Sequence, residues 1–386
     1  MSPARALLML AGLVAAWPAI AQIEPPKLSQ MADVLQRLQA GVARGDRAAY
    51  QEQFKQLKAM GAAIAAAKPE AWKGRREADA LVVYALSGGA IADIAPLLKD
   101  EAFAGDVGPT LRGAVAYITN HTAEAKELLG RIDLAALDLR LAGQVAFARS
   151  VLETKSDPKA ATALLDWARL VAPGTLVEEA ALRREISLLA EAGDAKRVAL
   201  LTRQYATRFP ASLYAADFFR ELAGTIAGLA DDPATHELMA RAISGLPVES
   251  RTAFWLGVAK AATVAGRFAA ASDAASSALK DARPDSSEEA RARLYHSAGE
   301  LLSGGYDSGL ADLHGISQAR LDRSDAALLA AVKSVAAELR TAPSAAAVDA
   351  QGAVAAGAKP EGAETTIQSA EEALKRTSSM VAGADP

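Results

Sequence analysis

Apolar positions along most of this chain recur every three to four residues, which is the spacing of one face of an α-helix. In the segment that follows Pro158, these positions are Ala161, Leu164, Leu165, Ala168 and Val171. The stripe returns one unit later at Val198, Leu201 and Tyr205. Almost no segment shows the strict alternation of apolar and polar residues that is typical of a half-buried β-strand. The pattern therefore predicts an all-α protein.

Prolines divide the middle of the chain into units of equal length. Each is 37 residues after the one before, at Pro173, Pro210, Pro247 and Pro284. Helix-breaking turns lie midway along the units, at Ser156-Asp157, Gly193-Asp194, Ala230-Asp231 and Gly266-Arg267. A fixed period of roughly 20 to 50 residues is typical of repeat proteins. We interpret each unit as helix, turn and helix, with the second helix ending at the proline because proline cannot continue the backbone hydrogen bonds.

Related turns continue the repeat toward both ends, at Gly45-Asp46, Ser87-Gly88-Gly89, Thr119-Asn120 and Ser303-Gly304-Gly305. Together the turns predict about eight helical hairpins between Lys27 and Arg340. The apolar spacing around Trp255 and Phe268 resembles that of tetratricopeptide repeats, although the 37-residue period exceeds the usual period of about 34. We therefore predict a tetratricopeptide-like α-solenoid over residues 22–341, with the less regular N-terminal pair as a capping unit.

Short polar motifs predict where several of these helices begin. Two aspartates are expected to cap a helix whose first residue is proline, in Asp157-Pro158 and Asp232-Pro233. Proline fits that position because its missing N–H would have no partner there. Two capping boxes, in which each side chain accepts a backbone N–H from the other end of the motif, are predicted at Thr175 with Glu178 and at Ser286 with Glu289.

The N-terminal residues have the order of a secretion signal. Arg5 precedes an apolar run over residues 6–17, and Ala19-Ile20-Ala21 is a cleavage site of small residues. The run is shorter than the roughly 20 apolar residues that span a bilayer. We therefore expect a cleaved signal peptide over residues 1–21, export and no membrane insertion afterwards. The alternative is an uncleaved membrane anchor.

The C-terminal residues 342–386 lack the apolar stripe and are rich in Ala and Gly, with Pro and Ser up to Pro360. This composition predicts a flexible tail. A helical pattern returns over residues 363–376. The sequence leaves open whether that segment packs back on the array, binds a partner or stays loose.

Composition narrows the function classes. The chain has no cysteine, which excludes disulfides, thiolate metal sites and cysteine nucleophiles. Its net charge of −4 argues against nucleic acid or an anionic membrane surface as the partner, because both are bound through basic patches. No motif for a nucleophilic serine or a phosphate-binding loop follows a predicted strand, because the sequence predicts almost no strands. We expect a protein that is not an enzyme and needs no cofactor.

The spacing of the histidines and tryptophans does not indicate a metal site or a binding site. The four histidines are His121, His236, His296 and His314, and no two of them have the spacing of zinc ligands. We expect no metal site, and we interpret His121 as a polar turn residue. Trp72, Trp167 and Trp255 lie at helical spacing, which favours the core over an exposed interface anchor.

The densest cluster of charge is Glu178, Glu179, Arg183, Arg184 and Glu185. One interpretation places acids at the positive end of a helix, with Glu179 and Arg183 as an i,i+4 pair on a solvated face. The other interpretation is a polar patch on the concave wall of the array. On that second interpretation Glu179, Arg183 and Arg184 are the candidate partner-binding residues.

Three segments carry a resemblance to a known family. They read Ala172-Pro173-Gly174-Thr175-Leu176-Val177-Glu178-Glu179-Ala180-Ala181-Leu182-Arg183-Arg184-Glu185, Tyr84-Ala85-Leu86-Ser87-Gly88-Gly89 and Gln204-Tyr205-Ala206-Thr207-Arg208-Phe209-Pro210-Ala211-Ser212. The chain resembles the MotC motility proteins of rhizobia and their α-proteobacterial relatives over about residues 30 to 340. The tail does not share the resemblance.

The resemblance implies a periplasmic accessory of the flagellar motor, one that engages the periplasmic part of the stator protein MotB and supports rotation. It transfers no catalytic residues and no contact residues to this chain. A generic periplasmic tetratricopeptide-like adaptor in cell-wall or envelope assembly remains the alternative. The oligomeric state stays open.

Overall fold

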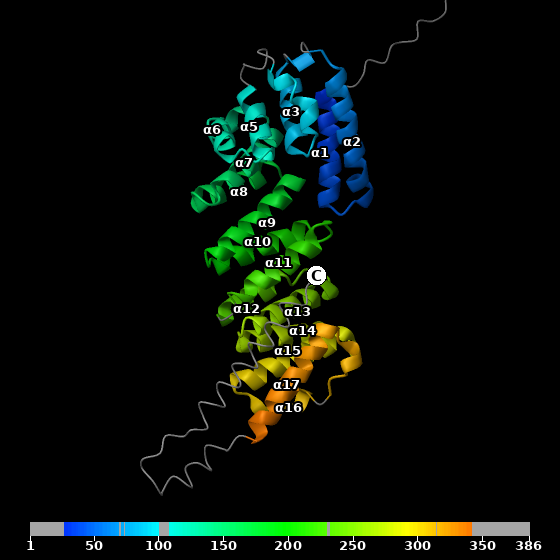
Figure 1. Cartoon of the computed structure of the whole chain (residues 1–386), viewed down its shortest axis with the longest axis vertical. Coiled ribbons are helices and arrows are strands. Elements are labelled where there is room, and N and C mark those ends of the chain that lie inside the picture. The colour runs from blue at the N-terminus through cyan, green and yellow to red at the C-terminus, as the bar shows by residue number, and fades with distance from the viewer. Residues whose placement is uncertain are drawn as a thin grey trace, which may run out of the picture.

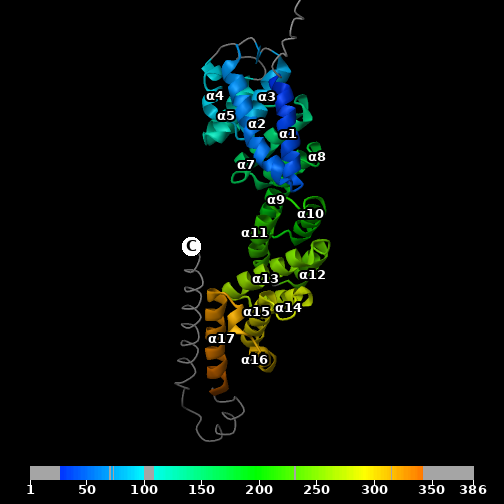
Figure 2. The ribbon, with the colours of Figure 1, turned by 90° about the vertical axis from the view of Figure 1, so that its right-hand side faces the viewer.

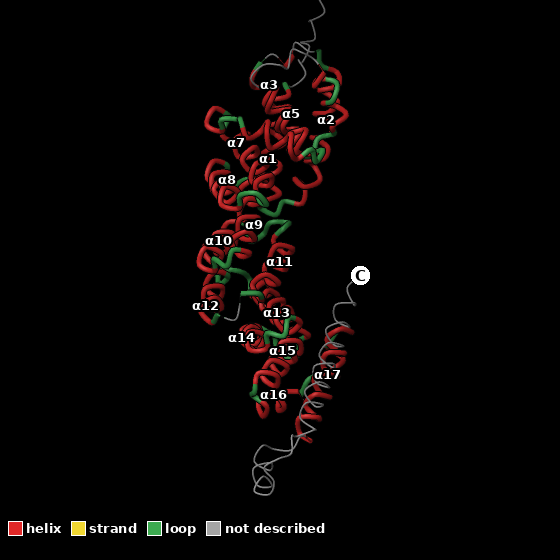
Figure 3. The backbone as a smooth tube through the Cα atoms, turned by 60° about the vertical axis from the view of Figure 1, so that its left-hand side comes forward, coloured by secondary structure: helices red, strands yellow, loops and turns green. Residues whose placement is uncertain are grey.

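The computed structural model describes residues 27–68, 71–72, 74–99, 108–229, 232–313 and 315–341. Within these ranges all regular structure is helical (Figure 3). The elements are α1 (Leu28–Ala43), α2 (Arg47–Ala66), α3 (Arg75–Leu86), α4 (Ile91–Ile94), η2 (Leu97–Lys99), α5 (Gly108–Ile118), α6 (Thr122–Gly130), η4 (Leu134–Ala136), α7 (Leu139–Glu153), α8 (Pro158–Val171), α9 (Leu176–Glu191), α10 (Ala195–Arg208), α11 (Ala215–Ala227), α12 (Pro233–Ala242), α13 (Val248–Val264), α14 (Phe268–Asp281), α15 (Ser287–Ser303), α16 (Tyr306–Leu313), η5 (Gln318–Arg320) and α17 (Arg323–Thr341). The predicted all-α class is confirmed.

Consecutive helices are separated by the turns that the sequence predicts. Seven of the eight predicted turns lie where one helix ends and the next begins, from Gly45-Asp46 between α1 and α2 to Ser303-Gly304-Gly305, of which Ser303 is the last residue of α15. The eighth, Ala230-Asp231, lies outside the described residues. Helices α9 to α15 follow one another along the long axis of the molecule, with α1 to α8 grouped at one end and α16 and α17 at the other (Figure 1).

The helices form an elongated stack (Figure 2), and their buried apolar side chains form separate clusters instead of one central core. The first helices of successive pairs pack on one another, α9 on α11, α11 on α13, α13 on α15 and α15 on α17. Four separate clusters of buried apolar side chains follow one another along the stack. Alanine allows the close approach; on α14 the buried alanines are Ala270, Ala271, Ala274, Ala275 and Ala278.

Side-chain caps begin several helices as predicted, at Asp157, Thr175, Asp232 and Ser286. The return half of each capping box differs from the prediction. Glu178 accepts the N–H of Gly174 at 2.5 Å, and Glu289 accepts the N–H of Asp285 at 2.6 Å, each one residue before the cap. Gly174 and Asp285 have φ values of 72° and 61°. Both residues therefore have a left-handed backbone conformation, which Gly adopts readily and Asp less often.

The N-terminal hairpin also contacts helices far along the chain. Helix α1 packs on α9 as well as on α2 and α3. Ala43 at the end of α1 belongs to the apolar cluster of helices α9 to α15. Gly45, with a φ of 90°, lies so close to Ala211 that an added Cβ would overlap the carbonyl oxygen there. In a regular repeat array each unit contacts only its neighbours, so this bridge is a departure from the regular pattern.

The predicted signal peptide over 1–21 and the predicted tail over 342–386, with its helix at 363–376, lie outside the described residues. No helix in the part of the chain that the structure covers has both the length and the apolar character needed to cross a membrane.

Two glycines in the left-handed region allow a matched test of the N-terminal bridge. Gly88→Ala places a Cβ in open space, so it should cost only the left-handed strain of roughly 1–2 kcal/mol. Gly45→Ala adds the overlap with Ala211, and we expect a larger loss in the free energy of unfolding, measured by urea denaturation. Equal losses for the two variants would contradict the packing of the α1–α2 turn on the loop before α11.

Candidate functional site

The charged cluster predicted from the sequence lies on α9, between α8 and α10. Its three acids are buried, with 1% of Glu178 and 0% of Glu179 and Glu185 exposed. The interpretation as a pair on a solvated face is therefore wrong. The reason is that α8, α10 and the loop before α11 cover this side of α9, which the local sequence does not show.

Glu179 is the acceptor at the centre of a buried cluster. Its Oε1 accepts hydrogen bonds from the hydroxyls of Tyr205 on α10, at 2.8 Å, and Ser212, at 2.6 Å. Arg183 forms an ion pair with the same oxygen at 3.7 Å and lies 5.0 Å from the ring centre of Tyr214. Burial and the nearby carboxylate raise the pKa of Tyr205. The tyrosine thus stays a neutral donor, and the cluster ties α9 to α10 and to the loop before α11.

Glu178 connects α9 to the end of α10. Arg208 donates to Glu178 Oε2 at 2.8 Å, and Gln204 donates to Oε1 at 3.3 Å. Arg184 points elsewhere, because its guanidinium donates to the hydroxyl of Thr154 at the end of α7, at 2.9 Å. The structure therefore brings Glu179 and Arg183 together and separates Arg184 from them.

Glu185 is the acid shared by two arginines from neighbouring helices. Arg169 of α8 donates to Glu185 at 3.1 Å, and Arg197 of α10 donates at 2.9 Å. Both arginines also pair with Asp166 of α8. Burial, followed by the charge of Asp166, raises the pKa of Glu185 to about 7, while Arg169 and Arg197 oppose the shift. This network joins α8, α9 and α10 across the boundary between two hairpins.

The sequence contains a signal for this burial that the prediction missed. Glu178, Leu182, Glu185 and Leu189 are spaced four, three and four residues apart, so the two acids continue the buried apolar stripe of α9. An acid in phase with leucines is expected to be buried and paired. Of the partners on α8 and α10, Tyr205 belongs to the apolar stripe that the sequence predicts, whereas Asp166, Arg169 and Arg197 have no comparable local signal.

The tryptophans and His121 lie mostly where the sequence predicts. Trp72 and Trp255 are buried, which confirms their interpretation as core residues, and Trp167 is partly buried. His236 stacks on Trp255 with ring centres 4.4 Å apart, and burial lowers the pKa of His236. His121 lies in the turn before α6, where it is exposed. Among the described residues, no group of three or more acids and histidines could hold a metal ion.

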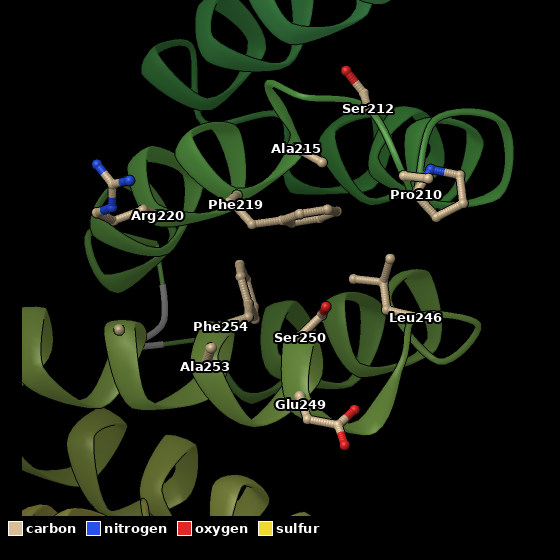
Figure 4. Close-up of a pocket in the computed structure, with 13 residues that line it drawn as sticks. Pro210, Ser212, Ala215, Phe219, Arg220, Leu246, Glu249, Ser250, Ala253 and Phe254 are labelled. Atoms are coloured by element: carbon tan, nitrogen blue, oxygen red, sulfur yellow. The ribbon is translucent and has the colours of Figure 1, made fainter. Parts of the chain in front are cut away.

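A second feature is a groove between α11 and α13 (Figure 4). It has a volume of about 540 Å³, and at its base the rings of Phe219 and Phe254 are arranged edge to face, with ring centres 6.3 Å apart. Alanines, Leu246 and Pro210 complete its apolar lining. Arg220 and Glu249 lie at its edges.

These features define an all-α protein of stacked helix pairs, in which the charged cluster of α9 holds helices together and an apolar groove opens further along. Residues 1–385 match the model of the family described as chemotaxis protein MotC. The chain belongs to the MotC family, as the resemblance in its sequence predicted. This is a family of motility proteins and not a known family of enzymes.

Among curated proteins, the chain is similar to the chemotaxis protein MotC of Rhizobium meliloti (strain 1021). The two are 32% identical over 307 residues, which cover 78% of this chain and 70% of the relative. No solved structure matches the chain.

The bond from Tyr205 to Glu179 should be a measurable part of the stability. Tyr205→Phe leaves the buried carboxylate with one donor fewer, and we expect a loss of about 1–3 kcal/mol in the free energy of unfolding by urea. The control is Tyr50→Phe on α2, where the ring packs edge-on against Phe54. That change should stay within about 0.5 kcal/mol. Similar losses for both variants would show that the hydroxyl of Tyr205 contributes nothing specific.

Glu185 should make stability fall as the pH rises toward neutrality. Its pKa is raised in the folded state to about 7 from an ordinary value of 4.5. Between these values the folded chain keeps a proton that the unfolded chain has lost. The free energy of unfolding therefore falls with pH, by at most about 1.4 kcal/mol per unit for this one group.

Glu185→Gln should remove this contribution, so the difference in unfolding free energy between the variant and the parent chain should change from pH 5 to pH 7.5. The control is Glu191→Gln, an exposed acid on the same helix. A pH-independent difference for Glu185→Gln would contradict the raised pKa.

Proposed function

We propose that this protein is a periplasmic accessory of the flagellar motor, which binds the periplasmic part of the stator protein MotB and supports flagellar rotation. The observation that carries the proposal is the match to the MotC family over residues 1–385. The secretion-signal pattern over residues 1–21 supports action in the periplasm. The protein takes part by binding and not by catalysis.

We further propose that the stack of helices is a tetratricopeptide-like α-solenoid that works by offering a long surface. The 37-residue period and the packing of first helix on first helix support this. Helices of about 15 residues are roughly 22 Å long, so the stack exposes broad walls on either side of the first helices. A partner segment can bind along such a wall without a deep pocket.

Within this surface we propose α9 as a contact region, with Glu179 acting through Arg183. Glu179 is fully buried and cannot touch a partner itself. It holds Arg183, whose side chain is 30% exposed, and the ring of Tyr214 fixes the guanidinium from the other side. An arginine held in this way can bind a carboxylate with little loss of side-chain entropy. Arg184 is the second proposed contact.

The direct test is binding between the full mature chain and the periplasmic part of MotB from the same host, measured by calorimetry. We expect a dissociation constant in the micromolar range or below. Arg183→Gln should weaken binding by about tenfold, or ~1.4 kcal/mol, while Arg203→Gln, at an exposed position of α10, should leave it unchanged. Each variant is first checked for parental stability.

The absence of binding would overturn the proposal and favour the adaptor in envelope assembly. Equal weakening by both arginine variants would show a general effect of charge and no contact region on α9. In the host, deletion of the gene should abolish swimming, and normal swimming of the deletion strain would contradict a motor role.

A further inference from the structure

The groove between α11 and α13 is open along the N-terminal halves of both helices. It is lined by Ala215, Ala216, Phe219 and Arg220 from α11, and by Glu249, Ser250, Ala253, Phe254 and Gly257 from α13. At one end the helices are in close contact, because a Cβ added to Gly257 would lie 3.0 Å from the Cβ of Ala223. At the other end the loop residues Pro210 and Leu246 mark the opening (Figure 4).

The shape and chemistry of this groove suit the apolar side of another helix. Phe219 and Phe254 lie at its base with 8% and 2% of their surface exposed, and the exposed alanines Ala216 and Ala253 lie on its upper walls. Because the wall residues are small, the axis of a third helix can approach the axes of α11 and α13 to roughly 8–10 Å, the usual distance between packed helices. Apolar side chains at i, i+3 or i+4, and i+7 are the usual occupants of such a groove.

The chain itself contains a segment with this pattern beyond the described helices. After α17 ends at Thr341, 45 residues remain (386 − 341). Within them, one face of residues 363–376 carries Ala363, Ile367, Ala370 and Leu374, spaced four, three and four residues apart. This is the stripe that an interhelical groove accepts.

The connecting residues are long enough for the segment to reach the groove. Residues 342–362 are 21 residues, which span up to about 70 Å when extended. The groove is two packing steps from α17, because α13 packs on α15 and α15 packs on α17. Each step is about 10 Å, and the length of α17 adds roughly 28 Å. The span is well within the reach of the connection.

Charged residues accompany both the stripe and the groove. At 100° per residue, Glu364, Glu371 and Lys375 lie on one side of the stripe, and Arg376 lies on the opposite face of the segment. The groove has Arg220, which pairs with Asp217, at its α11 edge and Glu249 at its α13 edge. These charges do not select an orientation of the segment, so the apolar stripe and the reach of the connection carry the proposal.

We propose that residues 363–376 form a helix that docks in the groove between α11 and α13 of the same chain. Ile367 and Leu374 lie over Phe219 and Phe254 in this arrangement. The docking covers the largest apolar part of the groove and does not depend on the proposed motor role.

The absence of cysteine from the chain makes a proximity test direct. In the full mature chain, Ala253→Cys and Leu374→Cys are introduced together and treated with a short bismaleimide. We expect a crosslink within one chain, because a tethered segment has an effective concentration of about a millimolar. The matched control pairs Leu374→Cys with Ala269→Cys, an exposed position on α14 that does not line the groove.

A yield at Ala253 no higher than at Ala269 would overturn the proposal. A crosslink that forms only between two chains would also overturn it, since the groove would then hold a second copy.

Hydrogen exchange on the full chain gives an independent readout. Ala253→Arg fills the groove from an exposed position, and we expect the amides of residues 363–376 to exchange at least about tenfold faster, which corresponds to ~1.4 kcal/mol of lost docking. Ala269→Arg should leave their exchange unchanged. Leu374→Asp should have the same effect as Ala253→Arg, whereas Gln368→Asp, on the polar side of the segment, should have none. Unchanged exchange in both groove-directed variants would contradict the docking.

Discussion

The structure depends on buried tyrosines that donate to carboxylates on neighbouring helices. The pairs are Tyr84 with Asp93, Tyr205 with Glu179, and Tyr295 with Asp325, at 2.6, 2.8 and 2.6 Å. Hydrophobic residues make up 51% of the chain but aromatic residues only 5%, so alanine forms much of the contact between helices. Smooth alanine faces pack closely but fix the register between helices poorly. A directed bond from a buried hydroxyl to a charged acceptor supplies that register.

The same pairs explain why the chain tolerates buried charge. An isolated buried carboxylate is strongly unfavourable, and it is kept only when it is paired and hydrogen-bonded. Asp325 is 1% exposed, and it receives the hydroxyl of Tyr295 and the Nε of Arg291 at 2.9 Å. Burial raises the pKa of Tyr295, so the phenol remains a donor at any physiological pH. Loss of one partner leaves the other charge uncompensated, and the hydrogen-bonded cluster therefore acts as a unit.

Local signals in the sequence predict helix ends and turns well, because proline, glycine and capping residues act over a few neighbouring residues. The cap at Asp157 and the turn at Gly193-Asp194 lie where the sequence places them. The predicted environment of Glu179 and Arg183, a solvated face, was wrong because burial depends on residues that are distant in the sequence. An i,i+4 ion pair has the same spacing on a wet face and in a buried interface. Only the helix that covers the pair decides between them, and that helix is a tertiary property.

The contact of α1 with α9 is also a tertiary property, and it ties the first helices of the chain to the middle of the stack. It joins units that are distant in the sequence, so no periodicity predicts it. Because the α1–α2 turn also meets the loop at Ala211, the helices from α1 to α10 are held by more than neighbour contacts. From α11 onward the first helices rest mainly on their neighbours. The groove between α11 and α13 lies just beyond this boundary but is joined to the cluster on α9. Its lining residue Ser212 donates to Glu179, and the ring of Phe219 packs against that of Tyr205, which donates to the same carboxylate. A ligand that fills the groove therefore contacts residues that also hold the helices around α9 together.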